Sequence, residues 1–180
     1  MSDENKTEAN ASAGAASAAS SAAGNSSMFA IKRIFVRDLS FEMPSGLEAF
    51  SLTSAPKVAQ DLNTEIDNID ENHFMVTLKM TVTVKVDEEK VAYLVEVHQS
   101  GVFQISGFNN EQMKHILTAQ CPTILYPYIR EAVDSIVIKA GFPPLALPPL
   151  NFDAIVAKAT AEAQGRAASA SASASVGGNA

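Results

Sequence analysis

The segment HFMVTLKMTVTVKVDEEKVAYLVEVHQSGVFQISG, residues 73–107, contains two long runs in which apolar side chains recur at every second position. In the first run, residues 73–86, every even position is apolar and the odd positions are mostly polar. A period of two predicts a strand with one buried and one solvated face, the usual pattern in antiparallel sheets. The four residues DEEK, 87–90, predict a tight reversal. The segment therefore predicts two antiparallel strands.

The second run, residues 91–107, begins with apolar side chains on both of its faces. Tyr93, Val95 and Val97 lie on one side, and Ala92 and Leu94 lie on the other. A strand that is apolar on both sides usually packs against something on both sides. We expect a partner subunit to supply the second cover. The expected oligomer interface includes Val95, Val97 and Gln99.

On the N-terminal side, residues 35–43, FVRDLSFEM, alternate in the same way and predict a half-buried strand that ends at Pro44. Its polar face holds Asp38, Ser40 and Glu42. An irregular connection, residues 47–56, leads to a short predicted strand at 58–62. The following ten residues, 63–72, have a polar composition that indicates a turn region.

On the C-terminal side the apolar period changes from two to three and four, which predicts helices. Residues 109–120 predict a helix with an Asn cap, and the Cys121–Pro122 pair predicts a break before a second helix that ends at Gly141. The segment 142–150 has four prolines and is expected to lie extended over a surface. Asn151 is expected to cap a last helix. Strands first and helices later predict an α+β fold, an antiparallel sheet with helices on one face.

The charge balance excludes several classes of partner. The chain has 20 acidic and 13 basic side chains and a formal net charge of −7. Nucleic acids and anionic lipid surfaces both select for clustered Lys and Arg, so neither is an expected partner. No apolar run approaches the roughly 18–20 residues that span a bilayer, and the acidic N-terminus does not resemble a signal peptide. We expect a cytoplasmic protein that does not insert into membranes.

Both ends of the chain are rich in Ala and Ser and poor in large apolar side chains. Such segments cannot offset the entropy cost of ordering. Residues 1–27 and 164–180 are therefore predicted to be disordered extensions. Residues 28–163 are predicted to form one domain of ordinary size.

No catalytic or metal-binding constellation is visible, and we expect neither an enzyme nor a cofactor. Glu96 and His98 share a strand face, but a lone half-buried histidine is far more often structural than catalytic. Cys121 and His115 offer a thiol and a base with no third group beside them. A single cysteine also excludes an internal disulfide.

Two surfaces are candidates for function, each with an ordinary alternative. The acidic face formed by Asp38, Ser40 and Glu42 is either a solubility device or a platform for a basic partner. The second candidate consists of apolar side chains in irregular segments: Phe50 and Leu52, then Phe142, Leu145, Leu147 and Leu150. They either cover the core or line a groove for an extended apolar peptide.

Four segments carry a specific resemblance to the SecB family of protein-export chaperones. They are DLSFEMP (38–44), LVEVHQSGVFQISG (94–107), CPTILYPYIRE (121–131) and FPPLALPPLNFDA (142–154). The resemblance implies a cytoplasmic homotetramer, a dimer of dimers, in which each protomer has a four-stranded antiparallel sheet. It also implies an ATP-independent holdase that binds unfolded preproteins and delivers them to the SecA motor.

The resemblance further implies two sets of site residues. The positions matching the face that docks the basic C-terminal tail of SecA are Asp38, Glu42, Leu94 and Glu96. The positions matching the client groove are Phe41, Phe50, Leu62, Phe142, Leu145 and Leu147. The chain lacks the Trp that the family often has before its second strand, and Ser54 or a neighbour stands there; Gln60 replaces a more apolar residue. The alternative function is a SecB-like adaptor dedicated to one client, such as a toxin–antitoxin component.

Overall fold

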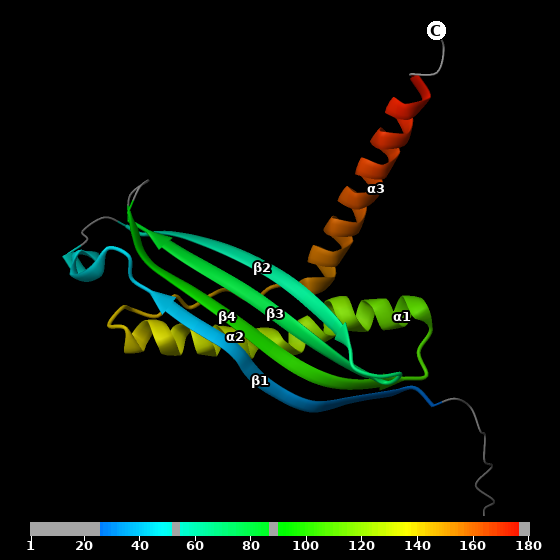
Figure 1. Ribbon diagram of the computed structural model, residues 1–180, viewed down its shortest axis with the longest axis horizontal. Coiled ribbons are helices and arrows are strands. Elements are labelled where there is room, and N and C mark those ends of the chain that lie inside the picture. Colours follow the sequence, from blue (N-terminus) through cyan, green and yellow to red (C-terminus); the bar gives the residue numbers. More distant parts are fainter. Residues whose placement is uncertain (1–25, 52–54, 87–89, 177–180) are drawn as a thin grey trace, which may run out of the picture.

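The computed structural model describes residues 26–51, 55–86 and 90–176, with side chains through residue 165. Leu52, Ser54, most of the reversal predicted at 87–90 and nearly all of the N-terminal extension lie outside these residues. Four antiparallel strands form one sheet in the order β1-β4-β3-β2 (Figure 1). The strands are β1 (Met28–Glu42), β2 (Lys57–Asn68), β3 (His73–Lys85) and β4 (Val91–Ser106). The predicted α+β sheet of four strands is confirmed.

The two alternating runs form the middle of this sheet. β3 pairs with β4 from His73↔Gln104 to Lys85↔Val91, and β4 pairs with β1 on its other side. One face, here called the helix-covered face, carries the even positions of β3 and the odd positions of β4. The fully buried side chains of this face include Val76, Leu78, Met80, Val82, Val95, Val97 and Phe103. The opposite side of the sheet is called the open face.

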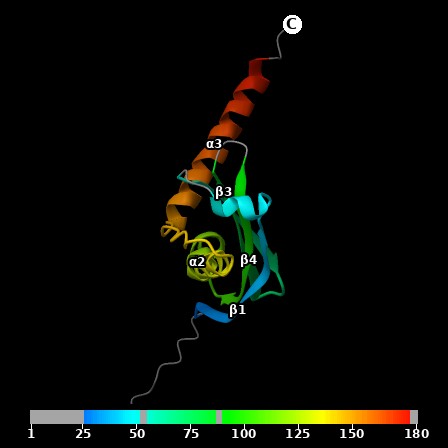
Figure 2. The same ribbon diagram turned by 90° about the vertical axis from the view of Figure 1, so that its left-hand side faces the viewer.

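Within the described residues, helices cover only the first of these faces. Figure 2 shows α2 (Cys121–Lys139) beside the sheet on one side, and among the strands it packs mainly against β4 and β3. Leu125, Ile129 and Val133 of α2 are fully buried against the strands. The antiparallel sheet is thus hydrophobic on one side and polar on the other, as its alternation predicts.

The helical region begins with α1 (Asn110–His115), which continues through a π turn, η2 (Ile116–Gln120), directly into α2. The predicted break at Cys121–Pro122 is therefore wrong. Cys121 N–H donates to the carbonyl of Ile116, five residues back, and the wide turn tolerates Pro122, which has no N–H to donate. The predicted Asn cap is Asn109, whose side chain accepts from Gln112 N at 2.8 Å.

The end of α2 follows the prediction. Gly141 takes φ 91°, a conformation that glycine adopts without strain. Its N–H donates to Ile138 O at 3.0 Å, and Phe142 N–H donates to Val137 O at 3.1 Å. This pair of bonds is a Schellman motif. It turns the chain at Phe142 onto the end of the sheet.

Two elements are longer than the sequence indicates. β2 extends to Asn68, so the turn region predicted at 63–72 is mostly strand. This edge strand pairs with β3 at every residue, and the pairing overrides its weak apolar pattern. Helix α3 (Phe152–Val176) continues past residue 164, where we predict a disordered tail. Its alanines favour helix more strongly than its serines oppose it. Asn151 caps this helix as predicted, accepting from Ala154 N at 3.0 Å.

Gly101 on β4 faces α2 in close contact, and we expect Gly101→Ala to destabilise the fold. A Cβ at this position would lie 2.7 Å from the ring of Phe103 and 2.9 Å from Leu125 Cδ2. Both residues are fully buried, so neither can move freely. Overpacking of this kind costs about 1–3 kcal/mol. Urea unfolding of Gly101→Ala should therefore show a lower midpoint than that of the unmodified protein.

The matched control is Gly165→Ala, because a Cβ there meets nothing within 4 Å. This substitution should leave stability the same or raise it slightly, since Ala favours helix by about 0.8–1 kcal/mol over Gly. An unchanged midpoint for Gly101→Ala would contradict the packing described here.

Candidate functional site

The open face of the sheet gathers the residues proposed to dock a basic partner. In the β1–β4 register, Ser40 lies opposite Glu96 and Glu42 lies opposite Leu94. Asp38 is opposite His98, one step further along. Opposed residues in antiparallel strands have their side chains on the same face, about 5 Å apart. Asp38, Glu42, Leu94 and Glu96 are thereby brought together in one patch, here called the acidic patch.

The carboxylates of the acidic patch are accessible. The side chains of Asp38 and Glu96 are 64% and 43% exposed. His98 lies between them, with Nε2 3.0 Å from Glu96 Oε1 and Nδ1 3.9 Å from Asp38 Oδ2. In the part of the chain that the structure describes, no helix covers this face (Figure 2). The patch can meet a partner without any rearrangement of the fold.

A second site is an aromatic hollow of about 440 Å³ where the connection after β1 meets the segment after α2. Phe142 is its centre: its ring lies 4.8 Å from that of Phe50 and 4.6 Å from that of Tyr93. Phe41 stacks on Tyr93 at 5.5 Å. The short helix η1 (Gly46–Ser51) carries Phe50 into this cluster. Phe50 is still 50% exposed, so the hollow opens to solvent.

The extended wall of this hollow is held in place by hydrogen bonds from α2. Asp134 Oδ1 accepts from the backbone N–H groups of Leu145 and Ala146 at 2.9 and 3.2 Å. The hydroxyl of Tyr126 donates to Pro148 O at 2.6 Å. These bonds hold the proline-rich segment 142–150 as a strap along α2. The extended course that we predict is interrupted at Ala146, whose φ of 48° is left-handed. A preformed wall lowers the entropy cost of binding a peptide.

The residues predicted for the client groove are only partly brought together. Phe50, Phe142 and Leu145 line the hollow, and Phe41 joins it through its aromatic contacts. Leu147 is 2% exposed and faces the core, and Leu62 on β2 is half-buried outside the lining. The lining also includes Tyr93, Val84 and Val86, which sequence reasoning missed. Val84 on β3 pairs with Tyr93 on β4, and their alternation was a signal that these two share a face. Val86 follows the end of β3.

The residues predicted for the oligomer interface lie on the helix-covered face. Val95 and Val97 are fully buried and Gln99 is 2% exposed within the single chain. Their side chains therefore pack under α2 of the same protomer. Gln99 Oε1 has no hydrogen-bond partner among the described residues.

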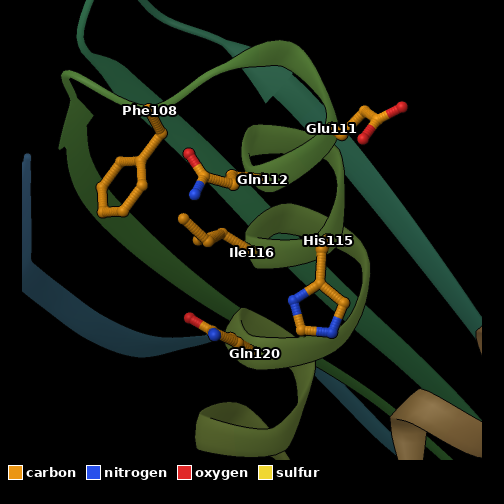
Figure 3. A pocket seen from close by; sticks show the side chains of 6 residues that line it. All are labelled: Phe108, Glu111, Gln112, His115, Ile116 and Gln120. Atoms are coloured by element: carbon orange, nitrogen blue, oxygen red, sulfur yellow. The ribbon is translucent and has the colours of Figure 1, made fainter.

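The histidine and cysteine considered for chemistry are structural. His115 is one of the side chains of the α1 region that line a second hollow (Figure 3), whose volume is about 390 Å³. The His115 Nε2 atom lies 2.8 Å from Asp153 Oδ1 at the start of α3. Cys121 is buried, and burial raises the pKa of its thiol to about 12. A thiol with such a pKa is protonated and unreactive at neutral pH.

The described residues contain no group of three or more His, Cys, Asp or Glu side chains that could hold a metal ion. Their helices do not have the length and apolarity that crossing a bilayer requires.

Comparison with known proteins identifies relatives over most of the chain. The family model described as "Preprotein translocase subunit SecB" matches residues 22–163. The protein-export protein SecB of Saccharophagus degradans is 50% identical over 162 residues, covering 90% of this chain and 92% of that protein. That of Marinobacter nauticus is 52% identical over 142 residues, covering 77% and 86%.

A solved structure shares the fold at low identity. It is a SecB-like chaperone of Mycobacterium tuberculosis, solved in complex with an antitoxin peptide. It is 16% identical, with a TM-score of 0.56, and the match covers 68% of this chain and 91% of that one. This neighbour supports the fold of the chain described here.

Proposed function

The chain belongs to the SecB family of protein-export chaperones, and on that basis we propose that it hands unfolded preproteins to the SecA motor as a cytoplasmic homotetramer. Its function as a chaperone of protein export, and not as an enzyme, follows from the family itself. Delivery to SecA, assembly as a tetramer and the cytoplasmic location are the parts of this function that we propose. Different features of the molecule support delivery and assembly.

The observation that carries the delivery step is the acidic patch on an open sheet face. Asp38, Glu42 and Glu96 present carboxylates on neighbouring strands, with Leu94 as an apolar contact between them. Clustered negative charge attracts a basic tail and orients its approach. We assign docking of the basic C-terminal tail of SecA to these four residues.

The aromatic hollow supports client binding by the same protomer. Its rings, prolines and aliphatic side chains present mainly apolar surface, and the hydroxyl of Tyr93 is the one polar side-chain group among the lining residues. Extended unfolded chains expose apolar side chains and unpaired backbone groups, which folded proteins hide. A surface of this kind favours breadth over selectivity. We assign the groove to Phe41, Phe50, Tyr93, Phe142 and Leu145, with Leu62 and Leu147 contributing from beneath or beside it.

The edge strand β1 supports assembly. Four apolar side chains of β1 pair with residues of the helix-covered face: Phe29, Ile31, Val36 and Leu39. Each is 36–47% exposed, because α2 lies mainly over β3 and β4. An apolar strip along an unpaired edge is a typical site of subunit contact. Val95, Val97 and Gln99 lie next to this strip, and a partner could supply the donor that Gln99 Oε1 lacks within the described chain. If each protomer makes this contact and one further contact with another protomer, the assembly is a dimer of dimers.

The experiment that tests this function is a titration of the purified protein with a secretory precursor held reduced and unfolded, with the folded precursor as control. We expect tight binding to the unfolded form only. Equal binding to both forms, or to neither, would contradict the proposal. Light scattering of the free protein should give the mass of four chains.

A dedicated-client adaptor makes a different prediction in the same titration. A general holdase binds several unrelated unfolded precursors with similar affinity, whereas an adaptor binds one. The relatives at about 50% identity are protein-export proteins, and the antitoxin peptide belongs to a neighbour at 16% identity. We therefore expect binding to several precursors.

A further inference from the structure

His98 occupies the centre of the acidic patch and contacts two of its carboxylates. It lies on β4 directly opposite Asp38, two residues from Glu96 on the same strand face. Its Nε2 is 3.0 Å from Glu96 Oε1, within hydrogen-bond distance, and its Nδ1 is 3.9 Å from Asp38 Oδ2. The histidine side chain is only 19% exposed, whereas that of Asp38 is 64% exposed.

The charged groups around His98 come from all four strands. They are Arg37 and Asp38 of β1, Glu65 of β2, Lys79 of β3 and Glu96 of β4. Lys79 lies directly opposite His98 on β3, but its Nζ is 2.9 Å from Glu65 Oε2. That ion pair, together with Arg37, lowers the pKa of Glu65. Lys79 is thus paired away from the patch, and His98 is the group that bridges Asp38 and Glu96.

From this geometry we propose that His98 is a positioning residue of the acidic patch and makes its docking of a basic partner pH-dependent. The inference rests on the docking function proposed above. Neutral His98 donates one hydrogen bond, to Glu96, and leaves both carboxylates with full negative charge. Protonated His98 carries a positive charge that is hydrogen-bonded to Glu96 and lies 3.9 Å from Asp38 Oδ2. This charge neutralises part of the negative charge that a basic tail requires.

The sign of the effect follows from linkage. A histidine side chain commonly changes charge between about pH 5 and 8. A basic partner disfavours an added positive charge on His98, because like charges repel. Affinity is therefore highest when His98 is neutral and falls as the pH is lowered. Release of the partner would be favoured wherever the local pH drops.

The test measures the affinity of the full-length protein for SecA at pH 7.5 and pH 6.0, in the unmodified chain and in two variants. We expect the unmodified protein to lose about fivefold in affinity between these pH values, the lower end of typical coupling between sites. His98→Gln keeps an amide donor for Glu96 but cannot gain a proton, so its ratio of affinities should be close to one. His98→Arg carries a fixed positive charge and should bind more weakly at pH 7.5 than the unmodified protein.

The matched control is His73→Gln, because His73 also faces the open side but pairs with Gln104 at the far end of the sheet and bonds to Asp70. It should retain the pH dependence of the unmodified chain. Any effect of pH on SecA itself is common to all variants and cancels in the comparison. The inference is wrong if the ratio of SecA affinities at pH 7.5 and pH 6.0 is the same for His98→Gln and the unmodified protein. It is also wrong if His98→Arg binds SecA as tightly as the unmodified protein at pH 7.5. Either result would leave SecA docking itself intact. Absence of SecA binding at pH 7.5 would instead reject both.

Discussion

Replacing Asp38 and Glu42 together with alanine is expected to weaken binding to SecA by at least about tenfold at low ionic strength. Both residues lie on β1 within the acidic patch, opposite His98 and Leu94. Each exposed pair that the partner's basic side chains form with these carboxylates contributes up to about 1 kcal/mol, and more where docking excludes water. The affinity can be measured by calorimetric titration with purified SecA.

The control for this double variant removes the same charge from the same face. Asp61→Ala with Asp67→Ala changes two carboxylates on β2, the opposite edge of the sheet, at positions that pair with Thr81 and Met75. We expect this variant to bind SecA nearly as well as the unmodified protein. The defect of the Asp38/Glu42 variant should also shrink as salt is added, since the Debye length is only about 8 Å at 0.15 M. Equal loss in both double variants would indicate a general charge effect and reject the assigned patch.

Replacing Phe142 and Phe50 together with alanine is expected to weaken binding to unfolded precursors by at least about tenfold. The two rings stack at 4.8 Å, and Phe142 also contacts Tyr93 and Phe41. Aromatic pairs contribute about 0.5–1.5 kcal/mol beyond the area they bury, and a client loses both the rings and the shape of the hollow. Fluorescence titration with an unfolded precursor measures the change.

A comparable substitution in a second hollow provides the control. Phe108→Ala removes the same side chain from the hollow at α1, whose volume of about 390 Å³ is close to the 440 Å³ of the aromatic hollow. We expect client affinity to be retained in Phe108→Ala. Because Phe50 is half-exposed, the double variant should stay folded, which circular dichroism can verify. Unaltered client binding by a folded Phe50/Phe142 variant would exclude the hollow as the primary groove.

The two sites lie at different places on one protomer, and this arrangement has a functional consequence. The acidic patch is on the open face, whereas the aromatic hollow lies at the end of the helix-covered face, where Tyr93 and Phe142 meet. On the assignments proposed above, a client in the hollow would leave the patch free for SecA. Transfer of the client would then begin from a complex that contains both partners.

Much of this organisation follows from the sequence alone, because local periodicity reports which side chains share a face. The alternation in residues 73–107 predicted β3 and β4, and Gly141 and Asn151 predicted helix ends, since these signals depend on neighbouring residues only. The family resemblance, confirmed by the comparisons, supplied the export-chaperone function. It also suggested the proposal that the acidic patch docks SecA.

The tertiary structure decided which faces are covered and which residues meet. β2 extends to Asn68 because β3 pairs with it, and the helix passes through Cys121–Pro122 because a π turn accommodates the proline. Periodicity also could not show that α2 covers the face that carries Val95 and Val97, whereas Glu96 and His98 lie on the open face. Nor could it place Tyr93 against Phe142, some fifty residues later in the chain. Such contacts depend on how distant segments pack, and no local pattern in the chain encodes that packing.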